Sequence, residues 1–200
     1  MGAEQAGRHA WADADWPDDV WLCLSLVTGI SAADTERMFN CDERIRDCTF
    51  DEAWSMWDDE SGRDHIVQIS QRGPWVVAVE PGGYLGSLEE VYEPLSASGR
   101  LIGAFWGWTA CQFVVADHAQ TLRCFDPMFY DEQQGGHHGE PLPAETDASF
   151  SAEGLHASML LLAERMAGMT IDRSWLLDSR APTYFATPPT PTRRRPAPSE

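Results

Sequence analysis

The sequence contains no lysine. All fourteen of its basic residues are arginines, and thirty-two Asp and Glu residues leave a formal net charge of −18. The absence of lysine excludes a Schiff-base lysine, the lysine of a phosphate-binding loop and any substrate clamp built from an ammonium group. The negative charge disfavours nucleic acids and anionic membranes and favours basic proteins as partners. The same charge would also serve solubility alone.

The sequence also lacks paired cysteines and a long apolar run. Its five cysteines are an odd number and form no C-x-x-C pair, so a disulfide framework is not expected. The longest apolar run, around Val20 to Val27, is less than half of a membrane span, and the N-terminus has no apolar signal segment. We therefore expect a cytoplasmic protein, and no motif requires a cofactor.

The length and hydrophobic content, 200 residues and 43%, predict one domain with its own core. Residues 18–180 are expected to form it, after a flexible N-terminus (1–17) and before a disordered Pro- and Arg-rich tail (181–200). The expected class is α+β, an antiparallel sheet of about five strands packed with four to five helices.

Local patterns place most of these elements. Alternating or continuous apolar runs predict strands at 65–71, 75–80, 101–108, 111–116 and 121–125, with a hairpin between the first two and a meander through the last three. The run 20–27 fits a buried strand or a short core helix equally well. Capping signals at Ser31, Thr49 and Ser87 and helical spacing predict helices at 31–40, 49–57, 88–97, 151–166 and 172–178. Residues 126–147 are expected to form a long surface loop.

A glycine-rich segment, Gly82 to Ser87, lies between an expected strand and an expected helix, where backbone amides can hold an anion. Its spacing fits neither G-x-G-x-x-G nor a lysine-containing phosphate loop, and Glu80 beside it would repel phosphate. A tight turn is the favoured interpretation.

Histidines and strand-end acids supply an alternative function, a small metal-binding domain or enzyme. His118, His137 and His138 are candidate metal ligands, although adjacent histidines in a glycine-flanked loop are more often solvated. Glu80 and Asp126 each end a strand, and if those strands were neighbours the two acids could share a proton or bind a cation. The ordinary alternative is that each acid caps a turn.

The leading interpretation is a non-enzymatic protein-interaction domain. Between Trp11 and Glu60 fourteen acidic residues stand against three arginines, and five of the nine tryptophans lie in the same segment. Aromatic anchors surrounded by acids suit a basic partner protein, as in an immunity-type or regulatory complex. The candidate partner-binding residues are Trp54, Trp57, Asp58, Asp59 and Glu60, with core tryptophans beside a solvated acidic face as the alternative.

Four strings give the sequence a family resemblance. They are residues 75–87 (WVVAVEPGGYLGS), 103–106 (GAFW), 125–127 (FDP) and 24–31 (LSLVTGIS). In these the chain resembles an uncharacterised actinobacterial family of the DUF6461 type, over about residues 18–178. The resemblance implies an origin and domain limits, but it assigns no activity and no site residues.

Overall fold

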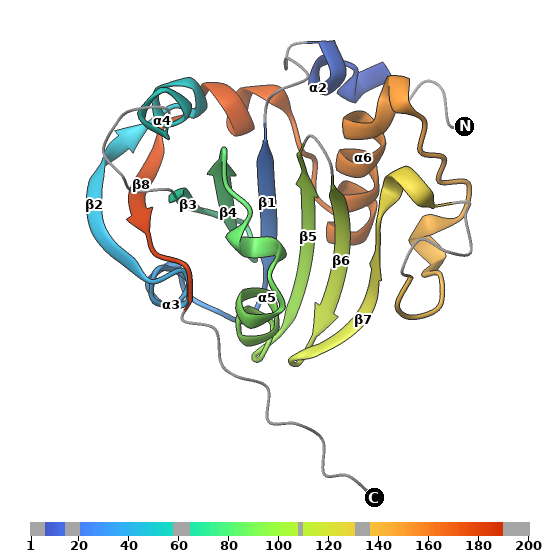
Figure 1. Cartoon of the computed structure of the whole chain (residues 1–200), viewed down its shortest axis with the longest axis horizontal. Coiled ribbons are helices and arrows are strands. Elements are labelled where there is room, and N and C mark those ends of the chain that lie inside the picture. Colours follow the sequence, from blue (N-terminus) through green and yellow to red (C-terminus); the bar gives the residue numbers. More distant parts are fainter. Residues whose placement is uncertain (1–6, 15–20, 58–64, 108–109, 131–136, 190–200) are drawn as a thin grey trace, which may run out of the picture.

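A computed structural model describes residues 7–14, 21–57, 65–107, 110–130 and 137–189 (Figure 1). Its strands are β1 (Leu22–Val27), β2 (Cys41–Cys48), β3 (His65–Arg72), β4 (Trp75–Pro81), β5 (Arg100–Trp106), β6 (Cys111–Asp117), β7 (Gln120–Phe125) and β8 (Ala181–Ala186). The strands form one antiparallel sheet in the order β2-β8-β3-β4-β1-β5-β6-β7. The α+β class is therefore confirmed, but the sheet has eight strands instead of about five.

The helices lie on both faces of this sheet. The α-helices are α2 (Trp11–Ala14), α3 (Ala32–Met38), α4 (Phe50–Trp57), α5 (Glu89–Leu95) and α6 (Leu155–Ala167). Short 3-10 turns are η1 (Gly7–His9), η2 (Leu85–Ser87), η3 (Pro127–Phe129), η4 (Pro143–Glu145) and η5 (Ala152–Gly154), and η6 (Ser174–Asp178) is a π-helical turn. None of the described helices combines the length and the apolar character needed to cross a bilayer.

The run whose sequence fitted strand or helix equally is the central strand β1. All six residues of β1 are buried, since β4 and β5 flank it and helices cover both of its faces. Leu22, Leu24 and Leu26 join the core beneath α6, which we call the α6 face. Val27 joins the core beneath α3 and α5, which we call the α5 face. A strand buried on both faces reads as a continuous apolar run, so the usual alternation is missing.

Several local predictions are confirmed in detail. The Ser31 Oγ accepts the amide N–H of Asp34 at 3.1 Å and begins α3. Thr49 and Glu52 cap α4 reciprocally, at 3.0 and 3.3 Å. The β3–β4 hairpin and the β5–β6–β7 meander are both present. Ser87 is not a helix cap, because its hydroxyl donates to the Tyr84 carbonyl and η2 precedes α5.

Two strands that the sequence did not predict complete one side of the sheet. Strand β8 lies between β2 and β3, so residues 181–186 of the expected disordered tail are part of the fold. The buried Tyr184 donates its hydroxyl to Glu36 at 2.7 Å. Strand β2 is charged and irregular because it is an edge strand, and its two register shifts and exposed charges protect that edge from pairing with other chains.

The folded part of the chain also begins earlier than expected. Residues 7–14 of the segment expected to be flexible form η1 and α2, which pack on α6. The Asp13 carboxylate accepts the amide N–H groups of His156 and Ala157 at 3.0 and 3.1 Å. This acid caps α6 from a distant part of the chain, which local sequence patterns do not reveal.

The described part of the expected loop, 126–130 and 137–147, folds onto the α6 face around a buried ion pair. Arg123 of β7 and Glu145 of η4 have almost no exposed side-chain surface and lie 3.1 Å apart. The Arg123 guanidinium also donates to the Gly139 carbonyl at 2.9 Å and lies over the Phe125 ring. Tyr130 donates its hydroxyl to Glu145 at 3.1 Å, so these groups fasten the segment to the sheet.

Candidate functional site

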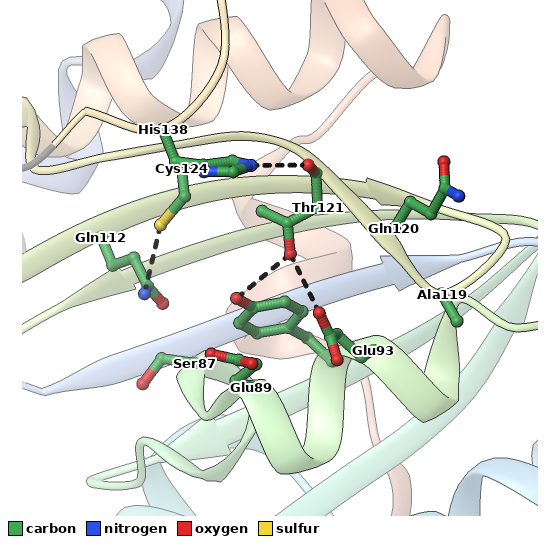
Figure 2. Close-up of a pocket in the computed structure, with 10 residues that line it drawn as sticks. Ser87, Glu89, Glu93, Gln112, Ala119, Gln120, Thr121, Cys124 and His138 are labelled. Atoms are coloured by element: carbon green, nitrogen blue, oxygen red, sulfur yellow. Dashed lines mark hydrogen bonds between the residues drawn. The ribbon is translucent and has the colours of Figure 1, made fainter. Parts of the chain in front are cut away.

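A groove lies on the α5 face between helix α5 and strands β6 and β7 (Figure 2). Helix α5 forms one wall and strands β6 and β7 form the floor. Its volume is about 680 Å³, and it is lined by Ser87, Glu89, Tyr92, Glu93, Gln112, Ala119, Gln120, Thr121, Cys124 and His138. We call it the α5–β7 groove.

The sequence of α5 explains its wall of the groove. Val91 and Leu95 are buried in the core of the α5 face, and Tyr92 is buried beside them with its hydroxyl at the groove. Glu89 and Glu93, one helical turn apart, are consequently directed to the groove side.

The floor comes from alternation along β6 and β7. Val114 pairs with Cys124, and a bulge between Val115 and Ala116 brings Thr121 opposite Ala116. Cys124 and Thr121 therefore face α5, whereas Arg123 between them points to the α6 face. His138 closes the outer side, because its backbone pairs with Cys124 as an isolated bridge and its Nε2 lies 3.0 Å from the Thr121 carbonyl.

Hydrogen bonds connect the α5 wall of the groove to its floor. The Thr121 hydroxyl lies 3.3 Å from the Tyr92 hydroxyl and 3.4 Å from the Glu93 Oε1 (Figure 2). Gln112 donates its Nε2 to the Cys124 Sγ at 3.5 Å. The Gln112 Oε1 is buried and has no hydrogen-bond partner among the described residues. A buried carbonyl oxygen without a donor favours binding of a group that supplies one.

The groove carries negative charge and no activated nucleophile. Two carboxylates and no arginine are among its described lining residues. Burial raises the pKa of the Cys124 thiol, although the hydrogen bond from Gln112 opposes this. Burial also raises the pKa of Tyr92, and the charges of Glu89 and Glu93 raise it further. Thiol and phenol therefore stay protonated near neutral pH, which suits binding better than covalent catalysis.

Three further cysteines, Cys41, Cys111 and Cys23, also have raised thiol pKa values. Burial raises the pKa of Cys41 to about 12 and that of Cys111 to about 11. Burial holds the pKa of Cys23 well above its usual range, and the neighbouring Glu80 adds to the effect. Nucleophilic attack requires a thiolate, and these environments disfavour it.

Glu80, one of the candidate acids, is held inside the glycine-rich loop. Its carboxylate is buried and accepts the amide N–H groups of Leu85 and Gly86, both at 2.7 Å. Burial raises the pKa of Glu80 to about 7, although these amides and the Cys23 thiol oppose the shift. A Cβ at Gly83 or Gly86 would lie within 2.9 Å of Glu80 atoms, so only glycine allows this approach. The loop does bind an anion, but the anion is the chain's own carboxylate.

The proposed pairing of Glu80 with Asp126 is wrong. Glu80 is the second-last residue of β4 and Asp126 follows β7, and β1, β5 and β6 lie between those two strands. The Asp126 Oδ1 accepts the amide N–H of Met128 at 2.9 Å and caps η3. Each acid therefore satisfies its own turn, which was the ordinary alternative.

The three candidate histidines lie in different surroundings. His118 is exposed in the β6–β7 turn, with its Nε2 3.7 Å from Asp117. The His137 Nδ1 lies 3.4 Å from the Arg123 guanidinium, whereas His138 lines the groove. The described residues contain no group of three His, Cys, Asp or Glu side chains placed to hold a metal ion.

The candidate tryptophans of α4 are half-buried. The rings of Trp54 and Trp57 lie 5.4 Å apart, and Trp54 also stacks on Phe50 at 6.3 Å. Trp57 covers Gly82, where an added Cβ would lie 2.6 Å from the indole. Asp58, Asp59 and Glu60 lie outside the described residues. Packing thus explains part of these aromatic surfaces, and their partner-binding role stays a prediction.

Sequence reasoning overlooked the groove itself. Its principal groups, Glu89, Tyr92, Glu93, Gln112 and Thr121, come from a short helix and two strands that are distant in sequence. The available signal was the pair of glutamates four residues apart on a helix whose other side is apolar. Many solvent-exposed helices carry that pattern. Helix α5 differs from them because β7 lies beside its glutamates, which the sequence does not reveal.

Comparison with other proteins adds a family and nothing on activity. A search of the curated proteins finds no match for the chain, and a search of the solved structures finds none either. Residues 9–186 match the sequence model of a family of unknown function, DUF6461, and this range includes β8 and part of the N-terminal segment that packs on α6. The chain therefore belongs to the DUF6461 family.

Proposed function

We propose that this protein acts by binding and that its α5–β7 groove receives a basic segment of another protein. The observation that carries the proposal is the lining of the groove, in which two carboxylates and several neutral acceptors meet with no described arginine among them. Both carboxylates would attract a cation that enters this groove.

Arginine is the side chain that the groove suits best. A guanidinium carries five donors, and the groove offers the carboxylates of Glu89 and Glu93 together with the unpartnered Gln112 Oε1. The buried ring of Tyr92 adds an aromatic surface beside them. A single exposed contact of this kind contributes little, so the affinity would come from several acting together.

The charge of the whole chain supports a basic protein as the partner. A net charge of −18 attracts positively charged molecules over a distance and raises their rate of encounter. An immunity-type or regulatory complex with a basic protein is the form of function that we propose. Its association should weaken as salt is added, because the screening length shortens.

The test compares two double variants with equal charge. Fluorescence anisotropy with labelled hexa-arginine as the probe measures affinity for the wild type, for Glu89→Gln/Glu93→Gln and for Glu90→Gln/Asp42→Asn. Glu90 adjoins Glu89 on α5 without lining the groove, and Asp42 is exposed on β2. We expect the groove variant to bind about tenfold more weakly and the control to change less than about twofold.

Equal losses in both variants would mean that the probe responds only to net charge, and the proposal would be abandoned. Unchanged binding in the groove variant would direct attention to the other candidate face, Trp54 and Trp57 on α4. Circular dichroism of each variant verifies that the fold is retained.

A further inference from the structure

A second cavity continues the groove along β7. Its volume is about 300 Å³, and it is lined by Ser87, Phe105, Ala110, Cys111, Gln112, Cys124, Phe125 and Asp126. Ser87, Gln112 and Cys124 line both cavities, so the two are contiguous. Together they form a trough on the α5 face from the start of β7 to the residue after its end.

Acids stand at the two ends of this trough. Glu93 lies at one end, 3.4 Å from Thr121 near the start of β7. Asp126 lies at the other end, directly after the last residue of β7. The five residue steps from Thr121 to Asp126 correspond to about 16 Å of strand, at about 3.3 Å for each step. Between the ends, Glu89 lies one helical turn from Glu93, and Gln112 and Cys124 lie at the centre, where the two cavities meet.

One unsatisfied group marks the middle of the trough. The buried Gln112 Oε1, without a partner among the described residues, belongs to a side chain that lines both cavities. The oxygen has almost no exposed surface, so an N–H of a peptide backbone in the trough reaches it once the Gln112 side chain turns toward the trough. This observation is independent of the acids and points to a ligand with donors along its length.

We infer that the ligand is an extended peptide segment with two basic side chains four residues apart. This inference rests on the proposed function and specifies its ligand. One basic side chain is held by Glu89 and Glu93 and the other by Asp126, while the backbone between them donates to Gln112. Residues at positions i and i+4 of an extended chain face the same side about 13 Å apart, and the length of an arginine side chain covers the remaining distance.

Three peptides of one composition test the spacing. They are acetylated and amidated Arg-Ala-Ala-Ala-Arg, Arg-Ala-Ala-Arg-Ala and Arg-Arg-Ala-Ala-Ala, and titration calorimetry measures their affinity for the full chain. Only the first places both arginines on one side at the required distance. We expect it to bind about fivefold more tightly than the other two.

The Asp126→Asn variant separates this inference from the proposed function. Asparagine also caps a helical turn, so η3 is preserved, but one charge is lost. We expect the advantage of the first peptide to disappear in this variant and to persist in Asp42→Asn. Equal affinities for all three peptides, still dependent on Glu89 and Glu93, would overturn the extended ligand and leave the proposed function standing. If no peptide binds in a way that depends on Glu89 and Glu93, both the extended ligand and the proposed function are overturned.

Discussion

At the scale of single residues, Arg123 and Glu80 show two ways of burying a charge. Arg123 is matched by the carboxylate of Glu145, by a carbonyl oxygen and by an aromatic ring. Glu80 has no cationic partner among the groups that interact with it and depends on two backbone amides and a thiol. The first arrangement leaves both ionised groups satisfied, whereas the second leaves a carboxyl that is easily protonated.

The Arg123→Met variant should lose about 3–5 kcal/mol in the free energy of unfolding, because Glu145 would remain buried without its partner. Urea denaturation measures the loss. The double variant Arg123→Met/Glu145→Leu removes both charges and should recover much of it. A loss below about 1 kcal/mol in the single variant would show that solvent reaches Glu145 easily.

Glu80 gives the stability a pH dependence with a definite sign. Its pKa is about 7 in the folded chain, against an ordinary value of 4.5, so the folded state binds more protons between these two values. The free energy of unfolding should therefore fall as the pH rises through this window, by at most about 3 kcal/mol. Denaturation at several pH values should give a flatter profile for Glu80→Gln. Parallel profiles for the two proteins would refute this assignment.

Gly86 is the residue at which added volume should be least tolerated near Glu80. A Cβ there would lie 2.5 Å from the Ser25 Oγ and 2.9 Å from the Glu80 Oε1. Gly86→Ala should therefore lower the free energy of unfolding by about 1–3 kcal/mol. Gly7→Ala is the matched control, since no atom lies within 4 Å of its added Cβ. Equal melting temperatures for the two variants would mean that η2 yields readily.

At the scale of elements, the sequence predicted what local patterns determine. The caps at Ser31 and Thr49, the β3–β4 hairpin and the meander depend on neighbouring residues, and all of them are confirmed. Strands β2 and β8 escaped prediction because charge at an edge and proline in a tail conceal strand patterns, and only pairing across the chain reveals them. The groove could not be predicted either, because segments that are distant in the sequence form it. The glycine loop was correctly expected to form a tight turn, because its neighbouring residues determine that turn.

The cap that Asp13 gives to α6 can be tested at this scale. Asp13→Ala should lower the free energy of unfolding by about 1 kcal/mol, because two amide N–H groups at the start of α6 lose their acceptor. Asp13→Asn keeps a side-chain oxygen and should lose less, as thermal denaturation would reveal. An alanine variant as stable as the wild type would mean that water replaces the carboxylate without cost.

At the scale of the whole molecule, charge and topology have separate consequences. The net charge of −18 attracts positively charged molecules in general, whereas the sheet fixes where α5 and β7 lie beside each other. The net charge follows from the composition alone. The position of the groove depends on the strand order, which the composition does not determine. The sequence therefore indicated a basic partner and placed its binding face on the tryptophan-rich segment around Trp54 and Trp57, but it gave no sign of the groove beside α5.

A chain ending at Arg180 tests the topology. It lacks β8, so β2 would lose its neighbour in the sheet and β3 would gain an open edge. We expect this truncated chain to be degraded quickly by a dilute protease, whereas a chain ending at Pro189 should resist like the full protein. Equal resistance of both truncated chains would show that the sheet closes without its last strand.

The place of β8 also bears on synthesis of the protein. Strand β2 leaves the ribosome long before β8, its neighbour in the described sheet. Strand β2 must therefore wait, unpaired on this side, until β8 has been synthesised. Its dense charges would keep the nascent chain from aggregating during that interval.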